Sequence, residues 1–264
     1  MDSSVAGSAT QVGASRFASR LLPVVWSRFN GVDLHARHHS QCRGGDFFDA
    51  FPVGQHVLFL LTDIAGLQLQ APEVLSQLQN VFRQKAQELF AGSDVNESDA
   101  LAELAHAFNL ALIEAAQGVH FAPTFLGCFN LTHGILSYCN AGNLLALVRS
   151  EGNVRVLESS GMSLGLFTHT TFEAAVLALQ QGDAVLVVTK GVTGSRRGGT
   201  EFGVQRVTRT LRNSTAASAS AICEAVLHDA HDFAHHPWSR FLNLFQKGKR
   251  CNQDDLTALA LVRR

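Results

Sequence analysis

The sequence predicts an α+β fold in which helices cover antiparallel sheets. Three observations support this prediction: the apolar spacing changes period along the chain, helix-like segments occur in clusters, and short strand-like runs follow one another closely. The expected order is strands, two helices, many strands, two helices and a last strand. A doubly wound parallel sheet would instead alternate strand and helix along the whole chain.

The first half of the chain contains strands followed by two helices. Residues 32–38 alternate apolar and polar side chains, as in a strand with one buried face. Residues 57–61 form a continuous apolar run, which is typical of a central strand. Pro72 fits the first turn of a helix whose apolar positions continue at helical spacing to Leu89. Ser98 is the expected N-cap of a second helix.

From residue 121 onward the chain is rich in strand-like segments. Residues 125–131, 135–140 and 144–149 are short runs separated by glycine-containing turns, which predicts a meander of hairpins. Residues 191–200 form a loop rich in glycine, arginine and serine. Further strands are expected at 154–157, 171–177, 184–189 and 256–262, and helices at 203–212 and 219–234.

Composition excludes several classes of protein. The 264 residues carry 21 Lys+Arg and 22 Asp+Glu, a net charge of −1 that argues against a nucleic-acid-coating protein. The hydrophobic fraction of 46% is too high for a disordered chain. No apolar run approaches the ~18 residues that span a membrane, and no signal peptide is recognisable. We expect a cytoplasmic protein with reduced cysteines, a flexible lead at 1–19 and one domain at 20–264.

Carboxylates at strand ends are the main candidates for chemistry. Asp46 follows two glycines, Asp63 ends the apolar run of residues 57–61, and Asp254 precedes the last strand together with Asp255. Hard cations such as Mg²⁺ and Mn²⁺ prefer oxygen ligands of this kind. Asp is also frequent in turns, so each residue taken alone is more simply explained as a turn former.

The sequence motifs that contain these aspartates change that interpretation. Seven motifs occur in order: GGDFFDAF (44–51), LLTDIAG (60–66), FAPTFLGCFNLTHGILSYCNAGN (121–143), GMSLGLF (161–167), QGDAVLVVTKGV (181–192), EFG (201–203) and DDLTALALV (254–262). Together they resemble the PPM-type metal-dependent serine/threonine phosphatases, specifically the SpoIIE/RsbU-like bacterial branch. The resemblance extends over about residues 20 to 264.

This resemblance implies a four-layer αββα sandwich with a metal site at one end. In that family two Mn²⁺ or Mg²⁺ ions activate a water that attacks a phosphoserine or phosphothreonine. Carried over, Asp46, Asp63 and the Ile64 carbonyl would hold one ion, and Asp63 with Asp254 would hold the second. In bacterial relatives the substrate is typically an anti-sigma-factor antagonist, so the resemblance suggests partner-switching signalling.

Two departures from the family pattern affect this site. Lys190 stands where the family has a ligand aspartate, and Gln68 stands where it has a glycine. A dication and a unit charge about 5 Å apart repel by roughly 6–7 kcal/mol at an effective dielectric near 20. Lys190 could fill the vacated space and pair with Asp63 and Asp254. The sequence therefore favours a pseudophosphatase in which the second metal ion is in doubt. A working one-metal site or a rearranged site is the alternative.

Two other patterns suggest rival sites. Ser163 lies in a G-x-S-x-G sequence, the nucleophile elbow of serine hydrolases, but that elbow requires a following helix and the next residues look β-like. His228, His231 and His235 fall on one face of a predicted helix and could bind Zn²⁺. A solvated helix face is the simpler interpretation, since no further ligand is paired with them.

Three weaker candidates remain. The histidines of residues 35–39 and Cys42 are interpreted as partly buried positions on or after a strand. Arg196 and Arg197 could contact a phosphoryl group or an acidic partner, although a solvated loop is the simpler interpretation. The basic cluster at 247–250 is too short for a nucleic-acid patch.

Overall fold

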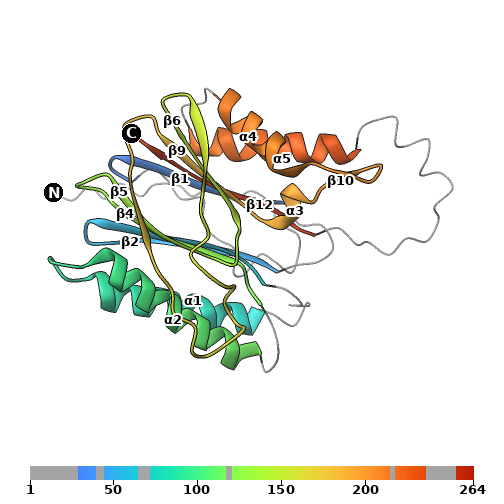
Figure 1. Cartoon of the computed structure of the whole chain (residues 1–264). Coiled ribbons are helices and arrows are strands. Elements are labelled where there is room, and N and C mark those ends of the chain that lie inside the picture. Colours follow the sequence, from blue (N-terminus) through green and yellow to red (C-terminus); the bar gives the residue numbers. More distant parts are fainter. Residues whose placement is uncertain (1–28, 40–44, 65–71, 117–120, 215–217, 236–253) are drawn as a thin grey trace, which may run out of the picture.

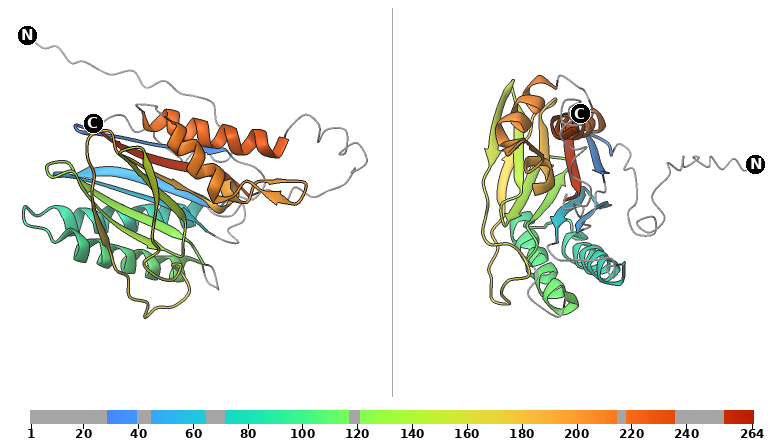
Figure 2. Two further views of the ribbon diagram at one scale, coloured as in Figure 1. Left: turned by 45° about the horizontal axis from the view of Figure 1, so that its top comes forward. Right: turned by 90° about the vertical axis from the view of Figure 1, so that its right-hand side faces the viewer.

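Two five-stranded antiparallel sheets lie face to face, and helices cover the outer face of each (Figures 1 and 2). The computed structural model describes residues 29–39, 45–64, 72–116, 121–214, 218–235 and 254–264. The predicted αββα sandwich is confirmed. The expected lead at 1–19 lies outside the described residues.

The first sheet has the strand order β2-β3-β4-β5-β8 and is covered by α1 and α2, below the sheets in Figure 1. Its elements are β2 (Asp46–Val53), β3 (His56–Asp63), β4 (Thr124–Asn130), β5 (Ile135–Ala141), β8 (Ala175–Ala178), α1 (Pro72–Phe90) and α2 (Glu97–Ala116).

The second sheet has the order β1-β12-β9-β6-β7 and is covered by α4 and α5, above the sheets in Figure 1. Its elements are β1 (Val32–His39), β6 (Leu145–Ser150), β7 (Asn153–Leu157), β9 (Ala184–Val188), β12 (Leu256–Arg263), α4 (Gly203–Asn213) and α5 (Ala219–His235). A short helix α3 (Lys190–Thr193) and a small hairpin of β10 (Arg196–Arg197) and β11 (Thr200–Glu201) follow β9.

Strand β3 explains why its sequence has no polar alternation. Leu58 and Leu60 pack into the core under α1 and α2, whereas Phe59 and Leu61 pack into the core between the two sheets. Successive side chains of a strand point to opposite faces, so a strand covered on both sides needs apolar residues throughout.

The predicted meander is wrong at its third strand. β4 and β5 form the expected hairpin, but β6 leaves that sheet and pairs with β7 and β9 in the other. Between β5 and β6 the backbone takes positive φ at Gly142 (87°) and Asn143 (69°). This left-handed turn redirects the chain across the sandwich instead of folding it back onto β5.

Two predicted element boundaries also need correction. Helix α2 begins at Glu97 instead of after Ser98, and the Asn96 side chain accepts a hydrogen bond from the Asp99 amide at 3.4 Å. Asn is as good an N-cap as Ser, and Asn96 lies two residues before the predicted Ser98. The strand predicted at 171–177 is only Ala175–Ala178, because pairing with β5 begins there.

A buried ion pair joins α1 to the first sheet. Asp49 on β2 is fully buried, and Arg83 donates to both of its oxygens at 2.7 and 2.8 Å, while Gln79 donates at 3.1 Å. The second aspartate of the GGDFFD motif therefore faces the helix layer, away from the aspartate that precedes it by three residues. Within the described residues, no helix is long and apolar enough to cross a membrane.

Candidate metal centre

The ends of β2 and β3 bring two of the predicted ligands together. Asp46 and Asp63 are directly opposite residues in the antiparallel ladder. The backbone continues this pairing, since the Ile64 amide donates to the Gly45 carbonyl at 2.9 Å. A Cβ atom at position 45 would lie 2.6 Å from the Ile64 carbonyl oxygen, so this close approach requires glycine.

The second sheet contributes two hydroxyls that fix Asp46. Thr189 Oγ1, just after β9, and Thr257 Oγ1, on β12, donate to Asp46 Oδ2 at 2.9 and 2.5 Å. The Thr257 amide in turn donates to Thr189 Oγ1 at 3.2 Å. His38 Nδ1 on β1 lies 2.9 Å from Thr257 Oγ1. A carboxylate of one sheet is thus held by side chains of the other.

Lys190 and Asp254 lie on neighbouring segments, because the backbone at Gly191 closely approaches the backbone at Asp254 and Asp255. A Cβ atom at Gly191 would lie 2.0 Å from the Asp255 carbonyl oxygen and 3.2 Å from that of Asp254. The start of α3 is therefore pressed against the entry to β12. Lys190 and Asp254 both line a cavity of about 320 Å³, whose other polar lining residues are Ser195, Arg196, Glu201, His231 and His235.

Two carboxylates at this end of the sandwich, Asp46 and Asp63, have raised pKa values. Burial, followed by the charge of Asp63, raises the pKa of Asp46 well above its ordinary value, despite the two threonine hydrogen bonds. Burial and Asp254 raise the pKa of Asp63, and Lys190 acts in the opposite direction. Asp46 is buried and Asp63 is partly buried, whereas Asp254 is exposed. Because like charges near a low-dielectric interior are costly without a counterion, the Asp46–Asp63 pair fits a divalent cation.

The structure pairs Asp46 with Asp63, next to Ile64, and places Lys190 and Asp254 on one cavity close enough for both charges to act on the pKa of Asp63. The expected ion pairs of Lys190 are not formed: among the described residues, none joins this exposed ammonium to Asp63 or Asp254. Lys190 is nevertheless near enough to lower the pKa of Asp63. Gln68 lies outside the described residues.

The rival sites lose support. Ser163 lies in the loop between β7 and β8, with no helix after it before α3, so the elbow geometry is absent from this described stretch. His228, His231 and His235 are exposed on α5. His228 pairs with Asp232 at 3.3 Å, and the rings of His231 and His235 stack at 4.3 Å.

The weaker candidates also have defined surroundings. Arg196 is exposed and forms an ion pair with Glu201 at 2.6 Å across the β10–β11 hairpin. Arg197 is exposed on the same hairpin. The histidines of residues 35–39 are partly buried on β1, as expected. Cys42 and residues 247–250 lie outside the described residues.

Sequence reasoning did not identify the residues that support the ligands. Thr189 and Thr257 each lie within one of the seven motifs. Thr189 directly precedes Lys190, and Thr257 follows Asp255 by two residues, so their positions in the motifs could have indicated a role at the site. His38 had no such signal, because its relation to Thr257 depends on the pairing of β1 with β12. Asp255 is buried and lies 3.6 Å from His38 Nε2.

Comparison with known proteins identifies the family. The family described as Stage II sporulation protein E (SpoIIE) matches residues 54–264. Protein IcfG of Synechocystis sp. (strain ATCC 27184 / PCC 6803 / Kazusa) is 27% identical over 199 residues, which are 67% of this chain and 31% of IcfG. The chain therefore spans less than a third of the length of that relative.

Solved structures agree with this match. The RsbU and RsbW domains of Rv1364c from Mycobacterium tuberculosis align with a TM-score of 0.64 and 25% identity, over 89% of this chain and 62% of that one. The SiaA-PP2C domain of Pseudomonas aeruginosa aligns with a TM-score of 0.67 and 16% identity, over 88% and 85% of the two chains. The chain belongs to the SpoIIE family and has the fold of its PPM-type (PP2C) phosphatase domains.

Proposed function

We propose that this chain is the phosphatase-like domain of a bacterial partner-switching protein, in which hydrolysis is impaired or lost while binding of a phosphoserine or phosphothreonine protein is kept. The observation that carries the proposal is Lys190, which lies at the cavity beside Asp254 and near Asp63. In the family pattern this position supplies a metal-ligand aspartate. An ammonium there repels a second dication instead of binding it.

The remaining carboxylates suit one Mg²⁺ or Mn²⁺ ion. Both threonine bonds go to Oδ2 of Asp46, so we assign Oδ1 as the ligand atom, together with Asp63 and the Ile64 carbonyl. RsbX, which shares this fold with a TM-score of 0.61, was solved in complex with magnesium. A bound ion would polarise a water and neutralise phosphoryl charge. Asp254, from the other sheet, would complete the carboxylate set.

The cavity beside the carboxylates is the proposed place of the phosphoprotein segment. Its volume of about 320 Å³ suits a side chain with a phosphoryl group, and Lys190 supplies a cation on its wall. Arg196 and Arg197 lie on the neighbouring hairpin and could contact the phosphoryl group or an acidic flank of the partner. Arg196 would then exchange its ion pair with Glu201 for the ligand.

The proposed partner is an anti-sigma-factor antagonist or a protein of similar role. The solved relative that joins an RsbU domain to an RsbW domain in one chain supports a place in partner switching. The present chain covers 62% of that relative, so any sensor or RsbW-like segment of the whole protein belongs to the proposal and not to the domain described.

The test is phosphatase activity on p-nitrophenyl phosphate with added Mn²⁺, comparing the natural chain with Lys190→Asp. We expect weak natural turnover and a gain of about tenfold or more in Lys190→Asp, because the change removes the repelling charge and restores a ligand. Ser163→Ala is the matched control and should leave any phosphatase activity unchanged.

A second candidate function is an active metal-dependent phosphatase. It is favoured by the retention of Asp46, Asp63 and Asp254 and by the clamping of Asp46 by two hydroxyls. Robust natural turnover that Asp63→Ala abolishes would establish this alternative and refute the pseudophosphatase proposal. If Lys190→Asp gained neither metal affinity nor activity, the assignment of Lys190 to the ligand position would be wrong.

A further inference from the structure

A second cluster of metal-ligating side chains lies far from the carboxylate centre. His56 and Asp63 are the first and last residues of the eight-residue β3, which places them roughly 23 Å apart at about 3.3 Å per residue. Cys128 on β4 and Glu97, the first residue of α2, meet His56 at that distant end. This cluster is therefore separate from the candidate metal centre and independent of the proposed function.

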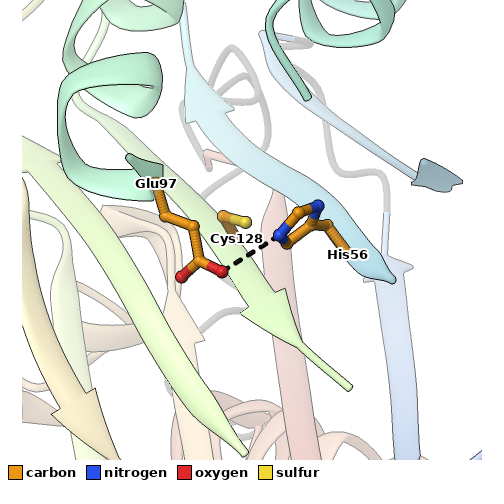
Figure 3. A group of neighbouring side chains, drawn as sticks. All are labelled: His56, Glu97 and Cys128. Carbon is orange, nitrogen blue, oxygen red and sulfur yellow. Dashed lines mark hydrogen bonds and ion pairs between the residues drawn. The ribbon is translucent and has the colours of Figure 1, made fainter. Parts of the chain in front are cut away.

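The topology explains why these three side chains converge. His56 pairs with Asn130 in the β3–β4 ladder, so Cys128, two residues before Asn130, lies diagonally across on the same face of the sheet. That face is covered by α1 and α2, and the first turn of α2 places Glu97 over the two strands. Figure 3 shows the imidazole, the carboxylate and the thiol directed toward one another.

The distances suit a small metal ion. One ligand atom from each residue lies within 4.8 Å of the others, and His56 Nε2 is 3.0 Å from Glu97 Oε1. Ligands around a tetrahedral Zn²⁺ lie about 3.3–3.8 Å apart, given metal–ligand bonds of about 2.0–2.3 Å. Adjustments of about 1 Å or less would therefore bring all three atoms onto one ion.

Neighbouring groups hold the cluster in place. Asn130 Nδ2 donates to Glu97 Oε1 at 2.6 Å, and Ser137 Oγ donates to Oε2 at 3.4 Å. The His56 ring packs edge-on against Phe90 with centroids 5.6 Å apart. Such outer contacts orient ligands and reduce the cost of assembling a site. The His56 and Cys128 side chains are almost completely buried, whereas the Glu97 side chain is 15% exposed and offers an entry path.

We propose that His56, Glu97 and Cys128 bind one Zn²⁺ ion, with water in the fourth position. Imidazole nitrogen, thiolate sulfur and carboxylate oxygen are the ligand types that zinc takes in proteins. Mg²⁺, which prefers oxygen, is the expected ion of the distant carboxylates and should not compete here. The ion would fix the N-terminus of α2 to β3 and β4.

Cobalt provides the direct test, because a Co²⁺–thiolate bond gives a near-ultraviolet charge-transfer band. The full chain, with excess Mg²⁺ to occupy the carboxylate centre, is titrated with Co²⁺ and then with Zn²⁺. We expect a charge-transfer band at one equivalent of Co²⁺ that Zn²⁺ removes. Cys128→Ser should abolish the band, and Cys139→Ser, at a buried cysteine on the adjacent strand, should keep it.

His56→Gln provides a second variant that leaves all cysteines in place. It should weaken Co²⁺ affinity by about tenfold or more, in line with the loss of one ligand. Circular dichroism of each variant checks that the fold is kept. The proposal is overturned if the natural chain gives no band at saturating Co²⁺. It is also overturned if the band survives Cys128→Ser, because the thiolate would then come from another cysteine.

Discussion

Asp46 depends on two threonines of the opposite sheet, and this dependence can be measured residue by residue. Thr257→Val removes the hydroxyl that donates to Asp46 Oδ2 and also the contact of His38 Nδ1, while keeping the shape of the side chain. We expect Mg²⁺ or Mn²⁺ affinity, measured by isothermal titration calorimetry, to fall by about tenfold or more, as for other residues that orient ligands.

Thr257→Ser is the matched control for this experiment. Serine restores the hydroxyl without the methyl group, so it should recover most of the metal affinity that Thr257→Val loses. Equal affinities of the natural chain and Thr257→Val would mean that the hydroxyl only fills space between the sheets and does not position Asp46.

The raised pKa of Asp46 predicts a pH dependence of stability. The folded protein holds this proton to higher pH than the unfolded chain, whose carboxyl has an ordinary value of 3.8. The stabilising contribution is therefore complete below that value and is lost as the pH rises through the raised pKa. In the metal-free protein, Asp46→Asn should be more stable than the natural chain near neutral pH, and the difference should vanish in acid.

Thermal unfolding in the presence of EDTA measures this difference in stability. It is followed between pH 4 and pH 8, which is roughly the range over which a raised carboxyl pKa takes effect. Added Mg²⁺ should reverse the order, because only the natural chain retains the carboxylate ligand. A natural chain that is the more stable of the two throughout this range without metal would contradict the assigned direction of the Asp46 pKa.

At the same residue scale, the candidate ligands could be located from the sequence, but the hydrogen bonds around them could not. Asp46, Asp63 and Asp254 are recognisable because each lies in a short contiguous sequence motif. The hydrogen bonds from Thr189 and Thr257 join residues separated by 143 and 211 positions. Contacts of that separation depend on how the two sheets are stacked, which apolar periodicity does not encode.

At the scale of the elements, a buried ion pair between Asp49 and Arg83 joins α1 to its sheet. Arg83→Met keeps the apolar stem but leaves the fully buried Asp49 carboxylate with Gln79 as its one side-chain partner within the part of the chain that the structure describes. Loss of one partner of a buried pair costs about 3–5 kcal/mol. The Arg83 side chain is 43% exposed, so solvent screening reduces our expectation to about 2 kcal/mol of unfolding free energy, measured by urea denaturation.

Lys85→Met is the matched control on the same helix. Lys85 makes ion pairs with Glu88 and Glu103, both of which are exposed, so its replacement should change the unfolding free energy little. If the two variants lost the same amount, the Asp49–Arg83 pair would count as an ordinary surface interaction despite its buried carboxylate.

The sequence predicts whether a segment is a helix or a strand more reliably than it predicts which strands pair. Helix and strand follow from local periodicity, and the strands at β3 and β9 and the helices α4 and α5 lie where the sequence places them. The predicted partner of β6 is wrong, because the turn at Ala141-Gly142 suggests a hairpin, although Gly142 and Asn143 carry the chain into the other sheet. A turn sequence fixes a change of direction and does not specify which sheet receives the next strand.

For the whole molecule, the candidate centre lies across the sandwich. Asp46 and Asp63 belong to the sheet under α1 and α2, whereas Asp254 precedes β12 in the other sheet. An ion held by all three would cross-link the two sheets in the folded state, and the unfolded chain would not bind it. Binding at a concentration of 100 Kd then adds about 2.7 kcal/mol to the unfolding free energy.

Asp254→Asn separates an ion that joins the two sheets from one held by the β2–β3 pair alone. If the ion joins the sheets, this variant should lose most of the rise in Tm that saturating Mg²⁺ gives to the natural chain. Asp94→Asn, at an exposed loop position, should keep the full rise. A full rise in Asp254→Asn would place the ion on Asp46 and Asp63 only, and Asp254 would then line the cavity with Lys190 without contributing to the metal site.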